Sequence, residues 1–234
     1  PLTILLKWQE SQGEHSKMAH VSRETLSPQT NTIAPTHSFL GDAFLANPFF
    51  GESLSWPQIN WTLLAHAVDF YQKSGFSYKE VPWTASPEAL RTTYPGYDKN
   101  TCKWLNLVGS AEQSFIQLHF DGHLPPGDYV ALTPCFREEE VLDDTHQSCF
   151  MKVELFRSGK VTEQSLTDII DICFKWFQSQ CGSGTLEKVI TENGVDINLN
   201  GIEVGSYGIH TYNGFSWIYA TGHAEPRFSV ALTQ

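Results

Sequence analysis

The order of the expected elements indicates an α+β fold in which helices flank an antiparallel β-sheet. In the second half of the chain, expected strands follow one another with few helices between them, which is typical of antiparallel pairing. Two of these strands, residues 195–200 and 202–210, meet at Asn200-Gly201, a strong hairpin signal. Residues 163–181 have their apolar side chains on one side and predict an amphipathic helix with one buried face.

The N-terminal part of the chain is expected to be an irregular arm followed by a helix. Residues 1–54 begin with a stretch rich in Ser, Thr, Gln and His that shows no regular period, which is typical of an irregular arm. Apolar residues at helical spacing then predict a helix from about Ser55 to Lys73. Ser55 can cap this helix, Pro57 suits its first turn and Gly75 suits the position after its end.

The other elements of the main domain, residues 55–234, follow from apolar patterns and turn formers. Pro82 holds residues 78–83 in an extended conformation. Expected besides these are strands at 104–108, 128–136, 149–157 and 215–221, a short helix at 111–120 and a last helix near 224–232.

Composition narrows the class of protein. The formal net charge of -11 disfavours a general nucleic-acid-binding face, because an acidic surface repels phosphates. No apolar run is long enough to span a bilayer, so we expect a soluble, cytoplasmic protein without membrane contact. The five cysteines form no Cys-x-x-Cys pair, which predicts reduced thiols without a zinc site.

The segment Phe136-Arg137-Glu138-Glu139, followed by a polar loop with His146 and then by Phe150, is the strongest chemical signal. Arg137 follows an expected strand, and its planar guanidinium can bridge a phosphate and a carboxylate. Phe150 begins the return strand and could stack on a purine ring. A surface hairpin held by salt bridges explains this stretch equally well.

Two later segments add weaker signals. In residues 220–228 a strand ends at small residues and Arg227 follows, which could be an anion site or an ordinary helix start with one arginine. In residues 201–210, Glu203 alternates with apolar neighbours. A carboxylate there could hold magnesium beside phosphate-binding arginines, or it could be an exposed strand residue.

Taken in order, these segments resemble the conserved motifs of class II aminoacyl-tRNA synthetases. Residues 136–154 resemble motif 2, residues 201–209 the acidic metal-binding strand, and residues 220–228 motif 3. The helix and extended segment at 57–83 resemble motif 1, the dimer-forming element, and residues 110–113 resemble the Thr/Ser-x-Glu segment that lines the amino-acid pocket. The resemblance covers about residues 55–232 and implies an antiparallel catalytic domain over residues 55–234.

The resemblance implies a role for each matching residue. Arg137 would hold the α-phosphate and the substrate carboxylate, and Glu139 the adenine or amino-group side of ATP. Phe150 and Arg227 would sandwich the adenine, with Arg227 also reaching the γ-phosphate, so that Arg137, Glu139 and Arg227 form the catalytic set. The remaining implied contacts are His146 with the terminal phosphates, Glu203 with Ser206 as the magnesium site, and Ser110, Glu112, Gln113, Lys152 and Glu154 in the amino-acid pocket. Arg137 and Arg227 must then converge over one antiparallel floor.

The implied activity is an adenylate-forming ligase that uses ATP and Mg²⁺ to activate an amino acid or similar carboxylate. No segment remains for an anticodon-binding domain, so we expect a non-tRNA acceptor and a homodimer formed through residues 55–83. Motif 3 departs from the family pattern at Ala224 and Pro226, and His210 stands where several relatives have arginine. Two alternatives therefore stay open: a non-catalytic paralogue that binds ATP or regulates a partner, and a minimal tRNA-charging enzyme. The substrate side chain is not readable, although Lys152 weakly favours an acidic group.

Overall fold

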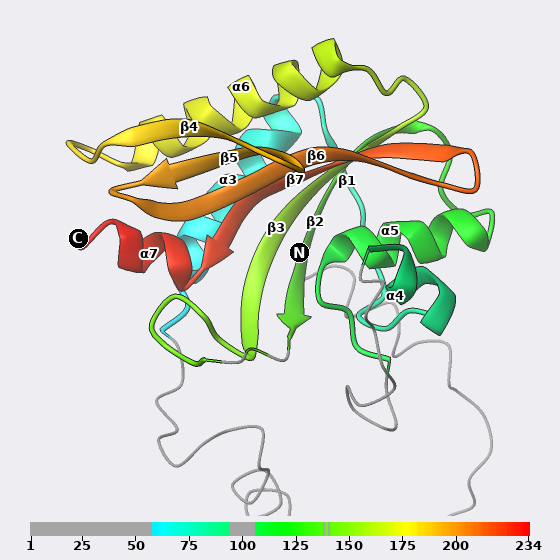
Figure 1. The fold of residues 1–234 in the computed structure, drawn as a ribbon, viewed down its shortest axis with the longest axis horizontal. Helices are drawn as coiled ribbons and strands as arrows, with labels where there is room; N and C mark the ends of the chain where they lie inside the picture. The colour runs from blue at the N-terminus through cyan, green and yellow to red at the C-terminus, as the bar shows by residue number, and fades with distance from the viewer. Residues whose placement is uncertain (1–57, 94–105, 138, 140) are drawn as a thin grey trace, which may run out of the picture. The chain divides into compact units, whose positions relative to one another are not determined.

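The computed structural model describes residues 58–93, 106–137, 139 and 141–234, all of which belong to one compact unit, residues 47–234. In these residues seven strands form one sheet in the order β1-β2-β3-β7-β6-β5-β4 (Figure 1). The strands are β1 (Ser77–Tyr78), β2 (Gly127–Phe136), β3 (Cys149–Ser158), β4 (Leu186–Thr191), β5 (Gly194–Leu199), β6 (Ile202–Tyr212) and β7 (Phe215–Glu225). The helices are α3 (Trp61–Lys73), α4 (Pro87–Thr93), α5 (Ala111–Phe120), α6 (Glu163–Gln180) and α7 (Arg227–Ala231).

The strand pairing confirms the predicted α+β class with an antiparallel sheet. The short edge strand β1 pairs parallel with β2, and every other neighbouring pair in the described sheet is antiparallel. Two short elements, β4 and α4, were not predicted. Five of the six residues of β4 are exposed, so it lacks the apolar alternation that marks a half-buried strand.

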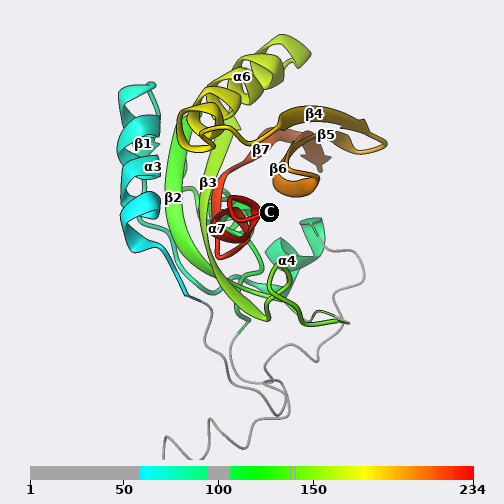
Figure 2. The same cartoon turned by 90° about the vertical axis from the view of Figure 1, so that its left-hand side faces the viewer.

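Helices cover both faces of the sheet (Figure 2). Val153 and Leu155 of β3 point to the face where α3, α6 and α7 pack, whereas Phe156 points to the face covered by α4 and α5. Alternate side chains of a strand point to opposite faces, so one strand supplies both cores. None of the described helices has the length and apolar character that a membrane span requires.

The start of α3 differs from the prediction. The helix begins at Trp61, and the Asn60 side chain caps it by accepting a hydrogen bond from the Leu63 amide at 3.1 Å. The predicted capping residues, Ser55 and Pro57, lie outside the described residues. An asparagine side chain is at least as good a cap as serine, which explains the later start. Gly75 follows the helix with φ of +101°, as its predicted position requires.

The helix α6 and the hairpin between β5 and β6 agree with their predictions. Thr162 and Ser165 form a reciprocal capping box at the start of α6. Asn200 and Gly201 adopt φ of 52° and 84°, the left-handed conformations that a tight two-residue hairpin needs. Of the strand predicted at 104–108, the described residues form only an isolated bridge between Leu107 and Thr84.

The strand β7 is longer than predicted because a β-bulge lets it continue. Thr221 pairs with Glu154 and His223 pairs with Val153, so Gly222 is an extra residue between them. The Tyr71 hydroxyl of α3 donates to the Gly222 carbonyl at 2.8 Å, and a Cβ at Gly222 would lie 2.7 Å from the Tyr71 ring. The bulge carries β7 to Glu225, so α7 begins at Arg227 rather than near residue 224.

A buried network of side-chain hydrogen bonds joins α6 to the end of β7. The Trp176 indole donates to Nδ1 of His223 at 3.2 Å, and Nε2 of His223 lies 2.7 Å from a Glu225 carboxylate oxygen. Because an indole N–H can only donate, Nδ1 is the acceptor and the proton of the His223 ring sits on Nε2. These contacts brace the strand end immediately before Arg227.

Candidate active site

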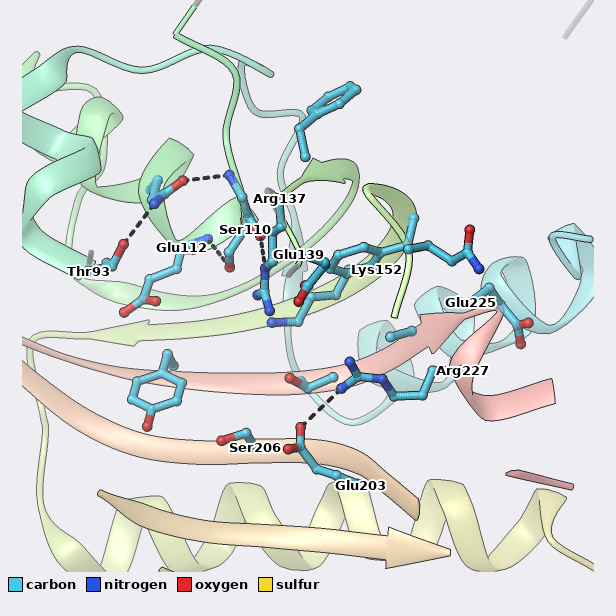
Figure 3. A pocket seen from close by; sticks show the side chains of 18 of the residues that line it. Thr93, Ser110, Glu112, Arg137, Glu139, Lys152, Glu203, Ser206, Glu225 and Arg227 are labelled. Carbon is cyan, nitrogen blue, oxygen red and sulfur yellow. Dashed lines mark hydrogen bonds and ion pairs between the residues drawn. The ribbon is translucent and has the colours of Figure 1, made fainter. Parts of the chain in front are cut away.

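A cavity of about 660 Å³ lies over the sheet on the side of α4 and α5, and most of the predicted site residues line it (Figure 3). The predicted residues that line it are Ser110, Glu112, Gln113, Arg137, Glu139, Phe150, Lys152, Glu203, Ser206 and Arg227. Glu154 is fully buried and His146 lies in the loop between β2 and β3, and neither residue lines the cavity. The strands that form the floor, β3, β7 and β6, are antiparallel.

Arg137 leaves the end of β2 and reaches toward the centre of the cavity. Its Nε donates to the Gly109 carbonyl at 3.0 Å, and its guanidinium carbon lies 5.2 Å from the centroid of the Phe150 ring. Among the described residues its two terminal nitrogens have no hydrogen-bond partner. The arginine is therefore held by its inner nitrogen while its outer nitrogens can bind an anion.

Arg227 enters the same cavity from the first residue of α7. Its Nε donates to the Thr145 carbonyl at 3.0 Å, and its Nη1 lies 3.4 Å from a Glu203 carboxylate oxygen. Arg227 thus connects the loop after β2 with the strand β6. The structure brings Arg137 and Arg227 together over one antiparallel floor, although 89 residues separate them in sequence (227 minus 137, less one).

The loop that carries His146 is organised by a carboxylate that sequence reasoning missed. Asp143 accepts hydrogen bonds from the Thr145 hydroxyl at 2.8 Å and lies 3.0 Å from Nδ1 of His146. Hydrogen bonds from Thr145 and then His146 hold the pKa of Asp143 well below its usual range. His146 is turned toward Asp143 and is not among the residues that line the cavity.

Lys152 and Glu154 stand two residues apart on β3 and point to the same face. The Lys152 ammonium lies 2.8 Å from a Glu154 carboxylate oxygen, which also accepts from the Ser110 hydroxyl at 2.5 Å. Burial raises the pKa of Glu154, and the attraction of Lys152 opposes that rise in part. The other carboxylate oxygen of Glu154 is buried without a partner among the described residues.

Glu112 lies in the first turn of α5, and its carboxylate is bound by two side chains that were not predicted as part of the site. One of its carboxylate oxygens accepts from the Trp217 indole at 2.6 Å and lies 2.9 Å from Nδ1 of His210. The neighbouring Gln113 uses its amide group within the protein. Its oxygen accepts from the Gly109 amide at 2.7 Å, and its nitrogen donates to the Thr93 hydroxyl at 2.8 Å.

The end of the cavity around Glu112 contains residues for which the sequence offered no chemical signal. They are Leu90 and Thr93 of α4, Leu107 before α5, and Tyr219 of β7. Tyr219 stands two residues from Trp217 and two residues from Thr221 on β7. This spacing indicates only that the three side chains share one face of the sheet. Burial, with the nearby charge of Glu112, raises the pKa of Tyr219 to about 12, so its hydroxyl stays protonated at neutral pH.

The residues present suit a magnesium ion that is bound mainly by a nucleotide. Among the described residues no group of three or more His, Cys, Asp or Glu side chains could hold a metal ion by itself. Magnesium typically takes one or two carboxylates and fills its remaining positions with substrate phosphates and water. Glu203, which lines the cavity with its side chain 46% exposed, and the Ser206 hydroxyl could supply the protein part of such a site.

Comparison with solved structures identifies the fold. Two structures of pyrrolysyl-tRNA synthetase from Desulfitobacterium hafniense match with TM-scores of 0.57 and 0.56, at 14% and 13% sequence identity. Each match covers 73% of this chain, and 67% and 68% of the respective synthetase chains. No protein-family model and no curated protein matches the sequence. The chain therefore has the fold of a class II aminoacyl-tRNA synthetase catalytic domain, as its motifs predicted.

Proposed function

We propose that the protein uses ATP to activate the carboxylate of an amino acid as an acyl-adenylate and passes the acyl group to an acceptor other than tRNA. The observation that supports this most is the convergence of Arg137 and Arg227 in one cavity. They stand over an antiparallel floor that also carries Glu203. Two guanidinium groups and a carboxylate in this arrangement suit a triphosphate with its magnesium ion.

The nucleotide would occupy the half of the cavity near Arg227. Phe150 and Arg227 would lie on either side of the adenine, and Arg227 would also reach the terminal phosphates. Glu139 lines the cavity and would contact the adenine side of the nucleotide, while His146 would reach the phosphates after release from Asp143. Glu203 and Ser206 would hold the magnesium ion, which neutralises phosphate charge when it is bound.

The amino acid would occupy the half of the cavity near Glu112. Arg137, at the junction, would hold both the substrate carboxylate and the α-phosphate through its two outer nitrogens. Glu112, Ser110 and Lys152 would contact the amino acid directly. Gln113 and Glu154 would act from behind, because their polar groups already bind Gly109, Thr93, Ser110 and Lys152.

The chemical step requires positioning rather than a covalent enzyme intermediate. A carboxylate oxygen of the substrate forms a bond to the α-phosphorus, the bond from that phosphorus to the bridging oxygen breaks, and pyrophosphate leaves. No proton has to move in this step. Charge on the reacting groups is balanced by Arg137 and Arg227, and their fixed placement lowers the barrier through orientation and electrostatics.

A non-tRNA acceptor is favoured by the charge of the chain. The formal net charge of -11 opposes the counterion release that drives binding of a polyanion such as tRNA. A protein side chain, a carrier protein or a small amine would meet no such repulsion. If the enzyme charges tRNA instead, transfer of labelled amino acid to tRNA would be observed and would weaken as salt is added.

A second candidate is an ATP-binding protein that does not catalyse adenylation. Arg227 and Glu203 pair with each other, although both are expected to contact the magnesium-bound phosphates. Ala224 also places a methyl group beside Lys152 where relatives have glycine. Binding of ATP and magnesium without adenylate formation would identify this alternative.

Amino-acid-dependent exchange of pyrophosphate into ATP tests the proposal. All amino acids are first screened by thermal shift with ATP and magnesium, because a ligand that binds the native state raises its stability. The amino acids that stabilise the protein are then assayed for exchange, with ATP alone as the control. We expect exchange with one amino acid or a small related group. Stabilisation by ATP without exchange for any amino acid would refute the adenylation proposal.

We also propose a homodimer that forms through the described part of residues 55–83. Three large aromatic side chains in this segment are 46% to 59% exposed, namely Trp61, Tyr78 and Trp83. Aromatic side chains are enriched at protein interfaces relative to the rest of the surface. Light scattering should give twice the chain mass for the wild type and the monomer mass for Trp61→Ser. A monomeric wild type at all concentrations would contradict the dimer.

A further inference from the structure

The carboxylate of Glu112 is held from behind by one fixed donor and one donor that can change its charge. Trp217 donates its indole N–H at 2.6 Å, and Nδ1 of His210 lies 2.9 Å from the same oxygen. An indole does not titrate near neutral pH, whereas an imidazole does. Glu112 is 6% exposed, and His210 lies outside the set of residues that line the cavity.

Both donors contact the same Glu112 oxygen, so the other oxygen is left for a ligand. Among the described residues no hydrogen bond is made to that second oxygen, and Glu112 lines the cavity. In Figure 3, Glu112 and Thr93 lie at one end of the cavity, and Glu225 and Arg227 lie at the other. Arg137 and Lys152 lie between these two groups.

Glu112 is therefore the charged residue that lines this end of the cavity. Lys152, a cation that also lines the cavity, is already paired with Glu154 at 2.8 Å. The other neighbours at this end, Leu90, Thr93 and Tyr219, carry no charge at neutral pH. A cationic ligand group would thus be recognised here by Glu112, and its binding would depend on how far His210 compensates the carboxylate charge.

We propose that His210 is a positioning residue that sets the charge of Glu112 and thereby the affinity of the site for the ammonium group of an amino acid. This inference rests on the proposed function and adds a residue outside the cavity to it. Neutral His210 donates a hydrogen bond to Glu112 and adds no charge beside it. The positive charge of protonated His210 offsets the charge of the Glu112 carboxylate, so the substrate ammonium binds more weakly.

The surroundings of His210 leave Glu112 as the partner that controls its titration. Among the residues that the structure describes, the titratable groups that face the ring are Glu112 from α5 and Tyr219 from β7, whose ring centroid is 4.5 Å away. Tyr219 stays neutral because its pKa is about 12. The hydrogen bond to Glu112 raises the pKa of His210, and partial burial of the ring opposes that rise. The contact with Glu112 is therefore the largest cause of the shift in the pKa of His210.

The same titration contributes to stability with a definite sign. Because the folded-state pKa of His210 is raised above its unfolded value, the native state binds the proton more tightly. The resulting stabilisation is complete below the unfolded pKa of about 6.5 and is lost as pH rises through the folded-state pKa. Substrate affinity and this part of the stability should therefore change in opposite directions with pH.

The test compares wild type with His210→Asn in the exchange assay from about pH 5.5 to about pH 9. Asparagine can place an amide N–H near the position of Nδ1 and does not titrate. In the wild type, KM for the amino acid should fall about tenfold as pH rises through the His210 titration. In His210→Asn it should stay near the low value throughout. KM for ATP should be the same in both proteins at each pH.

Two further measurements separate this role from a merely structural one. A deamino analogue of the substrate, which keeps the carboxylate but lacks the ammonium, should bind with an affinity that does not follow the His210 titration. The NMR titration of His210 should move to lower pH in Glu112→Gln, because the amide removes the charge that raises the pKa.

The outcomes distinguish the inference from the function on which it rests. If no amino acid supports exchange at any pH, the proposed function fails, and the NMR titration still decides whether Glu112 controls His210. If exchange occurs but KM for the amino acid varies with pH equally in wild type and His210→Asn, the inference is overturned. An identical His210 titration in wild type and Glu112→Gln would also overturn it.

Discussion

Replacement of Arg137 by alanine is expected to lower kcat/KM for amino-acid-dependent exchange by about 10² to 10³-fold. Arg137 reaches the centre of the cavity with its two outer nitrogens unpaired among the described residues, which suits simultaneous contact with a carboxylate and a phosphate. Within the described part of the chain, its side chain makes one hydrogen bond to Gly109 and contacts the Phe150 ring, so folding should change little. The exchange assay and a thermal melt of the same sample measure the two effects.

Two variants serve as controls for Arg137→Ala. Arg137→Lys keeps the charge but loses the paired donors, so it should recover only part of the activity. Arg157 lies on the neighbouring strand β3, where it is bound bidentately to Asp128, and neither residue lines the cavity. Arg157→Ala should therefore lose stability and retain exchange. Equal loss of exchange in both alanine variants would show that Arg137 has no special role in the site.

Replacement of Lys152 by methionine is expected to lower the free energy of unfolding by about 3 to 5 kcal/mol. The Glu154 side chain is 0% exposed, and its second oxygen already lacks a partner among the described residues. Removal of the ammonium would leave a buried charge with only the Ser110 hydroxyl. Chemical denaturation of wild type and variant gives the difference directly.

The pH dependence and a matched surface pair check this explanation. Burial already raises the pKa of Glu154, so loss of Lys152 should raise it further, and the variant should recover stability as pH falls and the carboxylate is protonated. Lys152→Met combined with Glu154→Gln should recover most of the loss at neutral pH. Lys73→Met breaks a pair whose side chains are 74% and 60% exposed and should have almost no effect. A comparably small effect for Lys152→Met would contradict the buried-charge explanation.

The sequence was informative where chemistry or periodicity leaves a local mark. The amphipathic α6 and the Asn200-Gly201 turn were predicted from local patterns, and both agree with the structure. The resemblance to motif 2 placed Phe150, Lys152 and Glu154 in the expected site, and the period of two along β3 puts them on one face of the sheet. These features depend on neighbours within a few residues, so the linear order is enough to find them.

Other structural features were not predicted, because they depend on residues that are distant in the sequence. The start of α3 depends on a choice between several adequate caps, and the short α4 is defined by its packing on α5. The extension of β7 depends on a bulge whose carbonyl is bound by Tyr71, 151 residues away. His210 and Trp217 approach Glu112 across 98 and 105 residues. No local pattern around any of these residues indicates such a partner.

The sequence by itself determined the order of the longer helices and strands, the antiparallel character of the sheet and the identity of the charged residues available for a site. Hydrophobic period and turn chemistry act over short distances, which is why they could be read directly. Only the tertiary structure decided which polar atoms remain free. Arg137 keeps its outer nitrogens and Glu112 offers one oxygen, because the hydrogen bonds that decide this join residues that are far apart in the sequence.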